Sequence, residues 1–239
     1  MFLQPWLAQA GSRLRALMAK ITSIEIQKKN PQRVNIHLDG HFAFGLSRVT
    51  AGWLRVGQEL TEERIAALKE DDARETALQQ ALRLLGYRAR SVSEIREHLQ
   101  KHAMPDVVIE QTIARLQETG LLDDRHFAET WVENRNVFRP RSRRLLALEL
   151  RRKGLQEEVI HQILAQNTDE ETLARQAAQK YLRKVQGFDW PTFRAKLGGF
   201  LARRGFSYEV VDAVLRGLWA ETRSNSKTYL TENEDMETK

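Results

Sequence analysis

The sequence contains no cysteine among its 239 residues, which excludes disulfide bonds and thiolate metal sites. A chain without cysteine suits a reducing cytoplasm. No apolar stretch approaches the roughly 18 residues that a membrane-spanning helix needs. The sequence also lacks a glycine-rich phosphate loop followed by Lys and Ser or Thr, and it sets no nucleophile on a strained turn. These absences predict a cytoplasmic protein that is not an enzyme and carries no cofactor.

The two ends of the chain differ from its centre. Residues 1–20 begin with a short apolar run, and their basic residues follow that run, which is the reverse of the order in a secretory signal. We expect this N-terminal extension to be a short amphipathic helix or disordered, and Met18 offers a second candidate for the first residue of the protein. Residues 221–239 are polar and predict a disordered tail.

Residues 21–72 predict a small β-rich domain. Apolar and polar residues alternate between residues 21 and 46, which is the period of half-buried strands. Asp39-Gly40 suits a tight hairpin turn, so we expect a three-stranded antiparallel β-meander. Because three short strands are only marginally stable alone, other residues must cover the apolar face. The expected cover consists of Trp53, Leu54, Val56 and a helix from about Thr61 to Lys69.

An internal repeat of 51 residues organises the rest of the chain, since Leu99, Leu150 and Leu201 are separated by this offset. Four further apolar columns share it: Ile95, Leu146 and Leu197; Val108, Val159 and Val210; Ile109, Ile160 and Val211; and Ile113, Leu164 and Leu215. Five columns in register over three copies identify each copy as one supersecondary unit. The predicted fold is therefore mainly α: three tandem three-helix repeats in an elongated, curved array after the β-meander. The repeats are placed at residues 73–122, 123–167 and 168–220.

Capping signals mark the helix ends within the repeats. Ser91 and Glu94 form a capping box. Gly154 and Gly205 stand where left-handed helix caps are expected, and Ala103 takes that place in the first copy. Further signals are Pro105 in the first turn of its helix, Gly120 at a helix end, Asp123 as a cap, and Thr168 with Glu171 as a second capping box.

The segment from Arg135 to Lys153 holds eight basic residues, and only Glu149 opposes them. The simplest interpretation is a solvated helix face. The density of charge, the excess of arginine and a similar basic pair in the third repeat favour a polyanion or an acidic partner instead. Phe138 either stacks on a base or partner, or anchors its loop in the core. The candidate contact residues are Arg135, Phe138, Arg139, Arg141, Arg143, Arg144, Arg151, Arg152, Lys153, Arg203 and Arg204.

Two smaller patterns were weighed for other chemistry. His98 and His102 have a helical spacing that can bind a metal, but no third ligand follows, so two solvated histidines are the preferred interpretation. Asp123 and Asp124 resemble paired carboxylates, yet the start of a helix explains them better. The sequence therefore predicts no catalytic, cofactor or metal site.

Several segments, in this order and spacing, resemble the RecX family of bacterial recombination regulators. They are Ala81–Leu85, Gly120–Asp124 with Arg125 and Phe127, Ser142–Arg144 through Lys153-Gly154, and Phe200–Ser207. The loop that the family writes with Gly-Tyr-Gly-Pro reads Val137-Phe138-Arg139-Pro140 here. The resemblance implies tandem three-helix repeats that bind RecA, lie along the groove of the RecA–DNA filament, and limit its extension, ATP hydrolysis and strand exchange during DNA repair and the SOS response.

On this reading the partners are the RecA filament and its single- or double-stranded DNA, and the chain acts as a monomer without a membrane. Two alternatives stay open. Three-helix units can hold a helix-turn-helix, so a stand-alone DNA-binding protein without sequence preference is one. The other is an enzyme of unknown type, which would need a closed cleft lined by acids or histidines.

Overall fold

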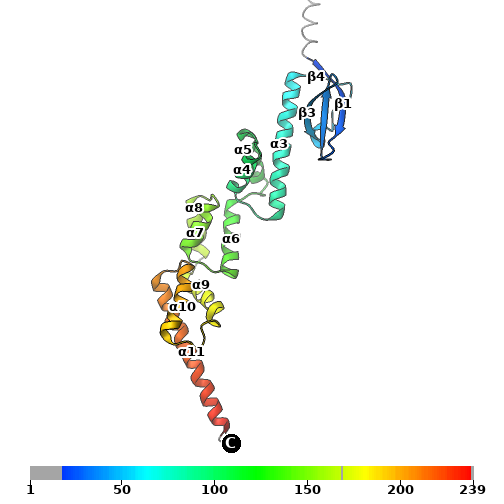
Figure 1. Ribbon diagram of the computed structural model, residues 1–239. Coiled ribbons are helices and arrows are strands. Elements are labelled where there is room, and N and C mark those ends of the chain that lie inside the picture. Colours follow the sequence, from blue (N-terminus) through cyan, green and yellow to red (C-terminus); the bar gives the residue numbers. More distant parts are fainter. Residues whose placement is uncertain (1–17, 168, 238–239) are drawn as a thin grey trace, which may run out of the picture. The chain divides into compact units, whose positions relative to one another are not determined.

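The computed structural model describes residues 18–167 and 169–237, and Figure 1 shows their elements coloured along the chain. Within these residues the chain forms one four-stranded antiparallel sheet followed by a series of helices. The mainly helical fold after a small sheet confirms the predicted fold class. The chain divides into two compact units, one of residues up to 89 with 95–121 and the other of 90–94 with everything from 122 onward. Residues 1–17 of the expected extension lie outside the described residues, and the curved array stays a prediction.

The sheet of the first unit contains one strand more than expected. Its strands are β1 (Met18–Ile26), β2 (Arg33–Leu38), β3 (His41–Ser47) and β4 (Glu59–Thr61), in the order β3-β2-β1-β4. The hairpin between β2 and β3 turns at Asp39 and Gly40, whose φ angles are 49° and 87°, as the sequence predicts. The predicted antiparallel meander is confirmed as β1, β2 and β3, and β4 is the strand that was not expected, because its three residues are too few to show an alternating pattern.

The sheet packs its inner face against α2 (Arg48–Ala51) and the start of α3 (Glu62–Tyr87), which runs beside the sheet in Figure 1. The core residues are Ile21, Val34, Ile36, Phe44, Leu46, Ala51, Leu54, Leu60 and Leu68. Of the predicted cover, Leu54 and the helix residue Leu68 are buried, whereas Trp53 and Val56 are 89% and 62% exposed, so that part of the prediction is wrong. The physical reason is the tight turn after α2, in which the Leu54 amide donates to the carbonyl of Ala51 and only Leu54 faces inward.

Helix α3 is a single helix of 26 residues, where the sequence analysis expected a short helix ending near Lys69. Thr61 caps it, with Oγ1 accepting from the Arg64 amide. The helix continues because its sequence contains no proline, and no glycine before Gly86. Asp72 fastens it to the sheet: its carboxylate accepts from the Ser47 amide at 2.5 Å and pairs with Arg33 at 2.7 Å. The expected domain boundary at residue 72 therefore falls inside one continuous helix.

The repeats follow, with one short helix after another. Their helices are α4 (Val92–Lys101), α5 (Asp106–Glu118), α6 (Asp124–Phe138), α7 (Arg143–Arg152), α8 (Glu157–Asn167), α9 (Glu170–Leu182), α10 (Trp190–Arg203) and α11 (Tyr208–Glu237). Four of the five apolar columns are buried in all three copies; in the fifth, Val108 is buried while Val159 and Val210 are partly buried. The 51-residue period is therefore the period of the core, which confirms the predicted repeat.

The last helix, α11, continues to Glu237, whereas the sequence analysis expected a disordered tail from residue 221. The sequence contains no glycine or proline after Gly217, so nothing in the backbone chemistry ends the helix. A polar composition by itself does not end a helix, and the predicted disorder is corrected for residues 221–237.

Most predicted caps are present. Ser91 Oγ accepts from the Glu94 amide at 3.2 Å, and Asp123 caps α6. The left-handed turns are at Gly154 and Gly205, with φ of 76° and 85°, and Ala103 adopts a φ of 54° at the matching place. Two assignments are corrected: Pro105 is the residue before α5, and Asp169 caps α9 by accepting from the Glu171 amide. Thr168 lies outside the described residues.

The second unit contains the same junction twice. Ser91, which caps α4, donates from Oγ to the carbonyl of Lys153 at 2.6 Å. Ser142, which caps α7, donates from its amide to the carbonyl of Arg204 at 3.0 Å. Both serines are buried, and the second pair follows the first by 51 residues. In each case the start of the second helix of one repeat (α4 or α7) lies against the left-handed turn that follows the second helix of the next repeat (α7 or α10).

Gly154 offers a test of this junction, because a Cβ there would lie 2.3 Å from Cβ of Ser93. We expect Gly154→Ala to lower the free energy of unfolding by about 3 kcal/mol, from left-handed strain together with overpacking. Gly187→Ala is the matched control, since Gly187 has a φ of +82° in open space. It should cost about 1 kcal/mol from strain alone. Equal losses in urea unfolding would contradict the packed junction.

Candidate anion-binding surface

The predicted basic segment lies on the end of α6, the following loop and α7. Glu149 of α7 holds two of its arginines. One carboxylate oxygen, Oε2, accepts from Trp131 Nε1 at 2.9 Å and from Arg135 Nε at 2.8 Å, and the other accepts from Arg141. The side chain of Glu149 is 13% exposed. Arg135 and Arg141, both predicted contact residues, are therefore part of an internal network.

The protonation of Glu149 reflects opposing effects. Burial raises the pKa of this carboxyl, but the hydrogen bonds from Arg135 and Trp131, with the charges of Arg135 and Arg141, hold the pKa below its ordinary value of 4.5. The carboxylate is therefore ionised at neutral pH and keeps both guanidinium groups turned toward it. Glu149 of α7 thereby connects the end of α6, through Arg135, to the following loop, through Arg141.

Lys153 and Arg204 serve the two repeated junctions. Lys153 pairs with Glu94 at 2.6 Å and lies over the ring of Trp131. Arg204 donates to the carbonyl of Pro140 at 3.1 Å and lies over the ring of Phe200. Burial and then repulsion by Arg141 and Arg139 lower the pKa of Arg204. Both residues have partners within the structure, and these partners place them at the contacts between repeats.

Arg151 also has a partner, but on the surface. Its guanidinium and the carboxylate of Glu157 are joined by two hydrogen bonds, one of 2.8 Å from Nη2. These bonds raise the pKa of Arg151 and lower that of Glu157. Because both side chains are about half exposed, an external phosphate or carboxylate can compete for this arginine.

Four predicted arginines are exposed and have no carboxylate within ion-pair distance in the described part of the chain: Arg139, Arg144, Arg152 and Arg203. Phe138 is 70% exposed, so it does not anchor its loop in the core, and its role in stacking stays a prediction. The predicted surface thus separates into supporting residues and residues that face solvent.

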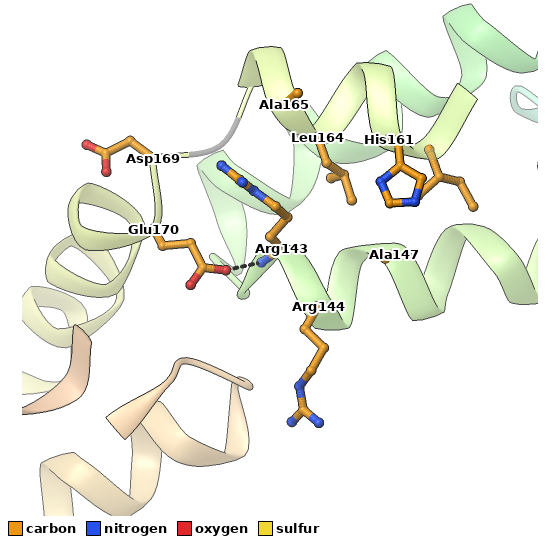
Figure 2. Close-up of a pocket in the computed structure, with 9 residues that line it drawn as sticks. Arg143, Arg144, Ala147, His161, Leu164, Ala165, Asp169 and Glu170 are labelled. Atoms are coloured by element: carbon orange, nitrogen blue, oxygen red, sulfur yellow. Dashed lines mark hydrogen bonds between the residues drawn. The ribbon is translucent and has the colours of Figure 1, made fainter. Parts of the chain in front are cut away.

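Arg143 and Arg144 line a hollow of about 630 Å³ beside α8 and the start of α9. Figure 2 shows Glu170 reaching back to the Arg143 amide, at 2.7 Å, while the side chain of Arg144 extends away from that contact. His161 and Asp169 complete a lining of mixed charge. The hollow is therefore less suited to an anion than the exposed arginines around it.

The sequence analysis missed one basic residue. Lys101, Arg152 and Arg203 are the last residues of α4, α7 and α10, and they are related by the 51-residue period. All three side chains are exposed. Applying the period to charged columns as well as apolar ones would have found Lys101. Each repeat thus ends its second helix with one outward cation, where the helix dipole also favours it.

The other weighed patterns have structural explanations. Asp123 caps α6, and Asp124 accepts from the Val92 amide at 2.8 Å. The rings of His98 and His102 lie 4.3 Å apart. Over the described ranges no group of three or more His, Asp or Glu side chains is placed to hold a metal ion. In the same ranges no helix is long and apolar enough to cross a membrane.

Comparison with known proteins identifies the architecture. Residues 19–61 match the RecX N-terminal domain, and residues 77–116, 123–164 and 169–215 match the first, second and third three-helix domains of RecX. The Regulatory protein RecX of Bacillus pumilus is 34% identical over 203 residues, which cover 83% of this chain and 77% of that protein. The chain belongs to the RecX family.

Other RecX proteins agree with this assignment. The Regulatory protein RecX of Bacillus subtilis is 31% identical over 202 residues, covering 83% of this chain and 76% of its own length. A crystal structure of regulatory protein RecX aligns with a TM-score of 0.59 at 30% identity, over 82% of this chain and 98% of the other. RecX of Lactobacillus salivarius shares the fold at 22% identity, with a TM-score of 0.55 over 62% of this chain and 97% of its own. The relatives are thus named as regulators rather than as enzymes.

Glu149 yields a prediction about acid stability. Its pKa is lowered in the folded chain, so its contribution is present above about pH 4.5 and is lost as the pH falls through the lowered value. We expect Glu149→Gln to lower the free energy of unfolding by about 2 kcal/mol at pH 7, because two partly buried arginines lose their charge partner. The difference from the unchanged chain should shrink toward pH 3 in urea unfolding.

Glu157→Gln is the matched control for this prediction, since Glu157 pairs with an arginine at the surface. Its effect at pH 7 should be clearly smaller, because exposed ion pairs contribute little. Equal effects of the two substitutions would show that Glu149 is no more structural than a surface acid.

Proposed function

We propose that this chain is a non-enzymatic regulator of RecA, which binds the RecA–DNA filament and inhibits its ATP hydrolysis, extension and strand exchange. In this proposal the chain acts as a monomer in the cytoplasm, and RecA alone hydrolyses the nucleotide. Membership of the RecX family supports the partner. The observation that carries the mechanism is the outward cation that ends the second helix of every repeat: Lys101, Arg152 and Arg203.

A protein built from repeats suits a partner that is itself built from repeats. A filament presents the same surface again with each subunit, and a repeated protein presents the same side chain again with each repeat. Arginine and lysine side chains that have no internal carboxylate can bind phosphate or carboxylate groups of a partner at little structural cost. Arg139, Arg144 and Phe138 extend the exposed surface of the second repeat, with Glu149 supporting the loop from within.

The test reverses the three repeated charges. The triple variant Lys101→Glu, Arg152→Glu, Arg203→Glu should weaken binding to preformed RecA–single-strand filaments by about tenfold or more, because like charges then face the partner. Inhibition of RecA ATP hydrolysis should fall in parallel. The melting temperature should change little, because the three side chains are exposed. Co-sedimentation with filaments and a coupled ATPase assay measure these effects.

The control is a second triple variant with the same change in net charge, Arg64→Glu, Arg83→Glu, Arg183→Glu, at exposed positions outside the repeated column. It should keep near-normal filament binding. Equal losses in the two variants would mean that net charge alone acts. Binding to bare duplex DNA as tight as to the filament would replace the proposal with a stand-alone DNA-binding protein.

A further inference from the structure

The segment after β3 carries the most exposed large hydrophobic side chain of the described residues, Trp53 at 89%. Val49 and Val56 nearby in the chain are 63% and 62% exposed. The sheet does not need these side chains, because Ala51 and Leu54 are the residues of this segment that enter its core. A nearly bare indole ring with exposed apolar neighbours in sequence is typical of a binding surface.

The charge of this segment has one sign. Arg48 and Arg55 are exposed, and the sequence holds no acidic residue between Asp39 and Glu59. Within the described ranges neither guanidinium has a carboxylate at ion-pair distance. Other arginines of the same unit do have one: Arg33 pairs with Asp72, Arg74 with Glu70 and Asp71, and Arg96 with Glu110.

The backbone beneath Trp53 is held at both ends. Before it, Ser47 caps α2 by accepting from the Thr50 amide at 3.0 Å, and its own amide is bound by the buried Asp72. After it, the Gly57 amide donates to the carbonyl of Ile21 at 2.8 Å. The indole is thus presented from an anchored turn, so a ligand has little backbone to order on binding.

We propose that this surface, formed by Arg48, Val49, Trp53, Arg55 and Val56, binds single-stranded nucleic acid. The Trp53 ring stacks on one base, and the two arginines contact the neighbouring phosphates. A single strand alternates flat apolar bases with anionic phosphates, which matches an open ring between two unpaired cations. Bases inside a duplex are already stacked on each other, so a duplex offers the ring no free face. The surface lies between β3 and β4 in the chain, and none of its residues belongs to the repeated column of Lys101, Arg152 and Arg203.

The first test measures binding of the full-length chain to a labelled oligothymidylate, without RecA, by fluorescence anisotropy. Trp53→Ala should weaken binding about tenfold, the size of effect expected for one lost base stack, and Trp53→Phe should restore most of it. The double variant Arg48→Glu, Arg55→Glu should reduce the slope of log affinity against log salt by roughly 1.4, for two lost phosphate contacts. Arg64→Glu, Arg83→Glu is its charge-matched control and should keep the normal slope.

The second test locates the contact. An oligonucleotide carrying 5-iodouracil should crosslink to the tryptic peptide Val49–Arg55, in which Trp53 is the one aromatic residue. Unchanged oligonucleotide affinity in Trp53→Ala, or crosslinks confined to other peptides, would overturn the proposal. If Trp53→Ala weakens filament binding while leaving oligonucleotide affinity unchanged, the surface is a protein contact and the proposal is wrong. The triple variant of the repeats tests the regulatory function separately.

Discussion

The helical part of the second unit depends on one repeated contact. A buried serine at the start of one helix meets the left-handed turn that follows the corresponding helix of the next repeat. Ser91 meets the turn at Lys153-Gly154, and Ser142 meets the turn at Arg204-Gly205. Each serine both caps its own helix and bonds to the turn, Ser91 through its hydroxyl and Ser142 through its backbone amide, so a single residue fixes a helix start and a neighbouring repeat together. The closeness of the approach explains the glycines, because a Cβ at either turn would overlap the serine helix.

This contact also determines what the basic residues do. At each turn the inner cation, Lys153 or Arg204, is held by its neighbours, while the residue before it, Arg152 or Arg203, points to solvent. The period that repeats the fold therefore repeats an outward charge as well. Glu149 has a similar effect on the loop before α7, since it pairs with the partly buried Arg135 and Arg141 and leaves Arg139 exposed.

The core of the repeats could be read from the sequence because burial acts on every copy in the same way, and apolar columns keep its period. The division of the basic residues could not, because it depends on pairs distant in the chain: Glu94 and Lys153 are separated by 59 residues. The prediction of β4 and of the domain boundary failed for a different reason. β4 has three residues, and the boundary expected at residue 72 is crossed by α3, so neither leaves a local pattern that a sequence rule can detect.

Trp53 shows how such an error can be informative. A large apolar residue beside a small sheet is expected to cover it, because a sheet of this size needs apolar surface from elsewhere. Here α2, α3 and Leu54 already provide that surface, so the core has no place left for the indole. A side chain that the fold neither buries nor pairs contributes nothing to stability where it stands, and its exposed apolar area is unfavourable in water. The free energy of the exposed ring becomes favourable when another flat apolar surface covers it. The ring also stands between cations in the sequence, with no acid nearby. A nucleic-acid strand supplies both a flat base for the ring and phosphates for the cations.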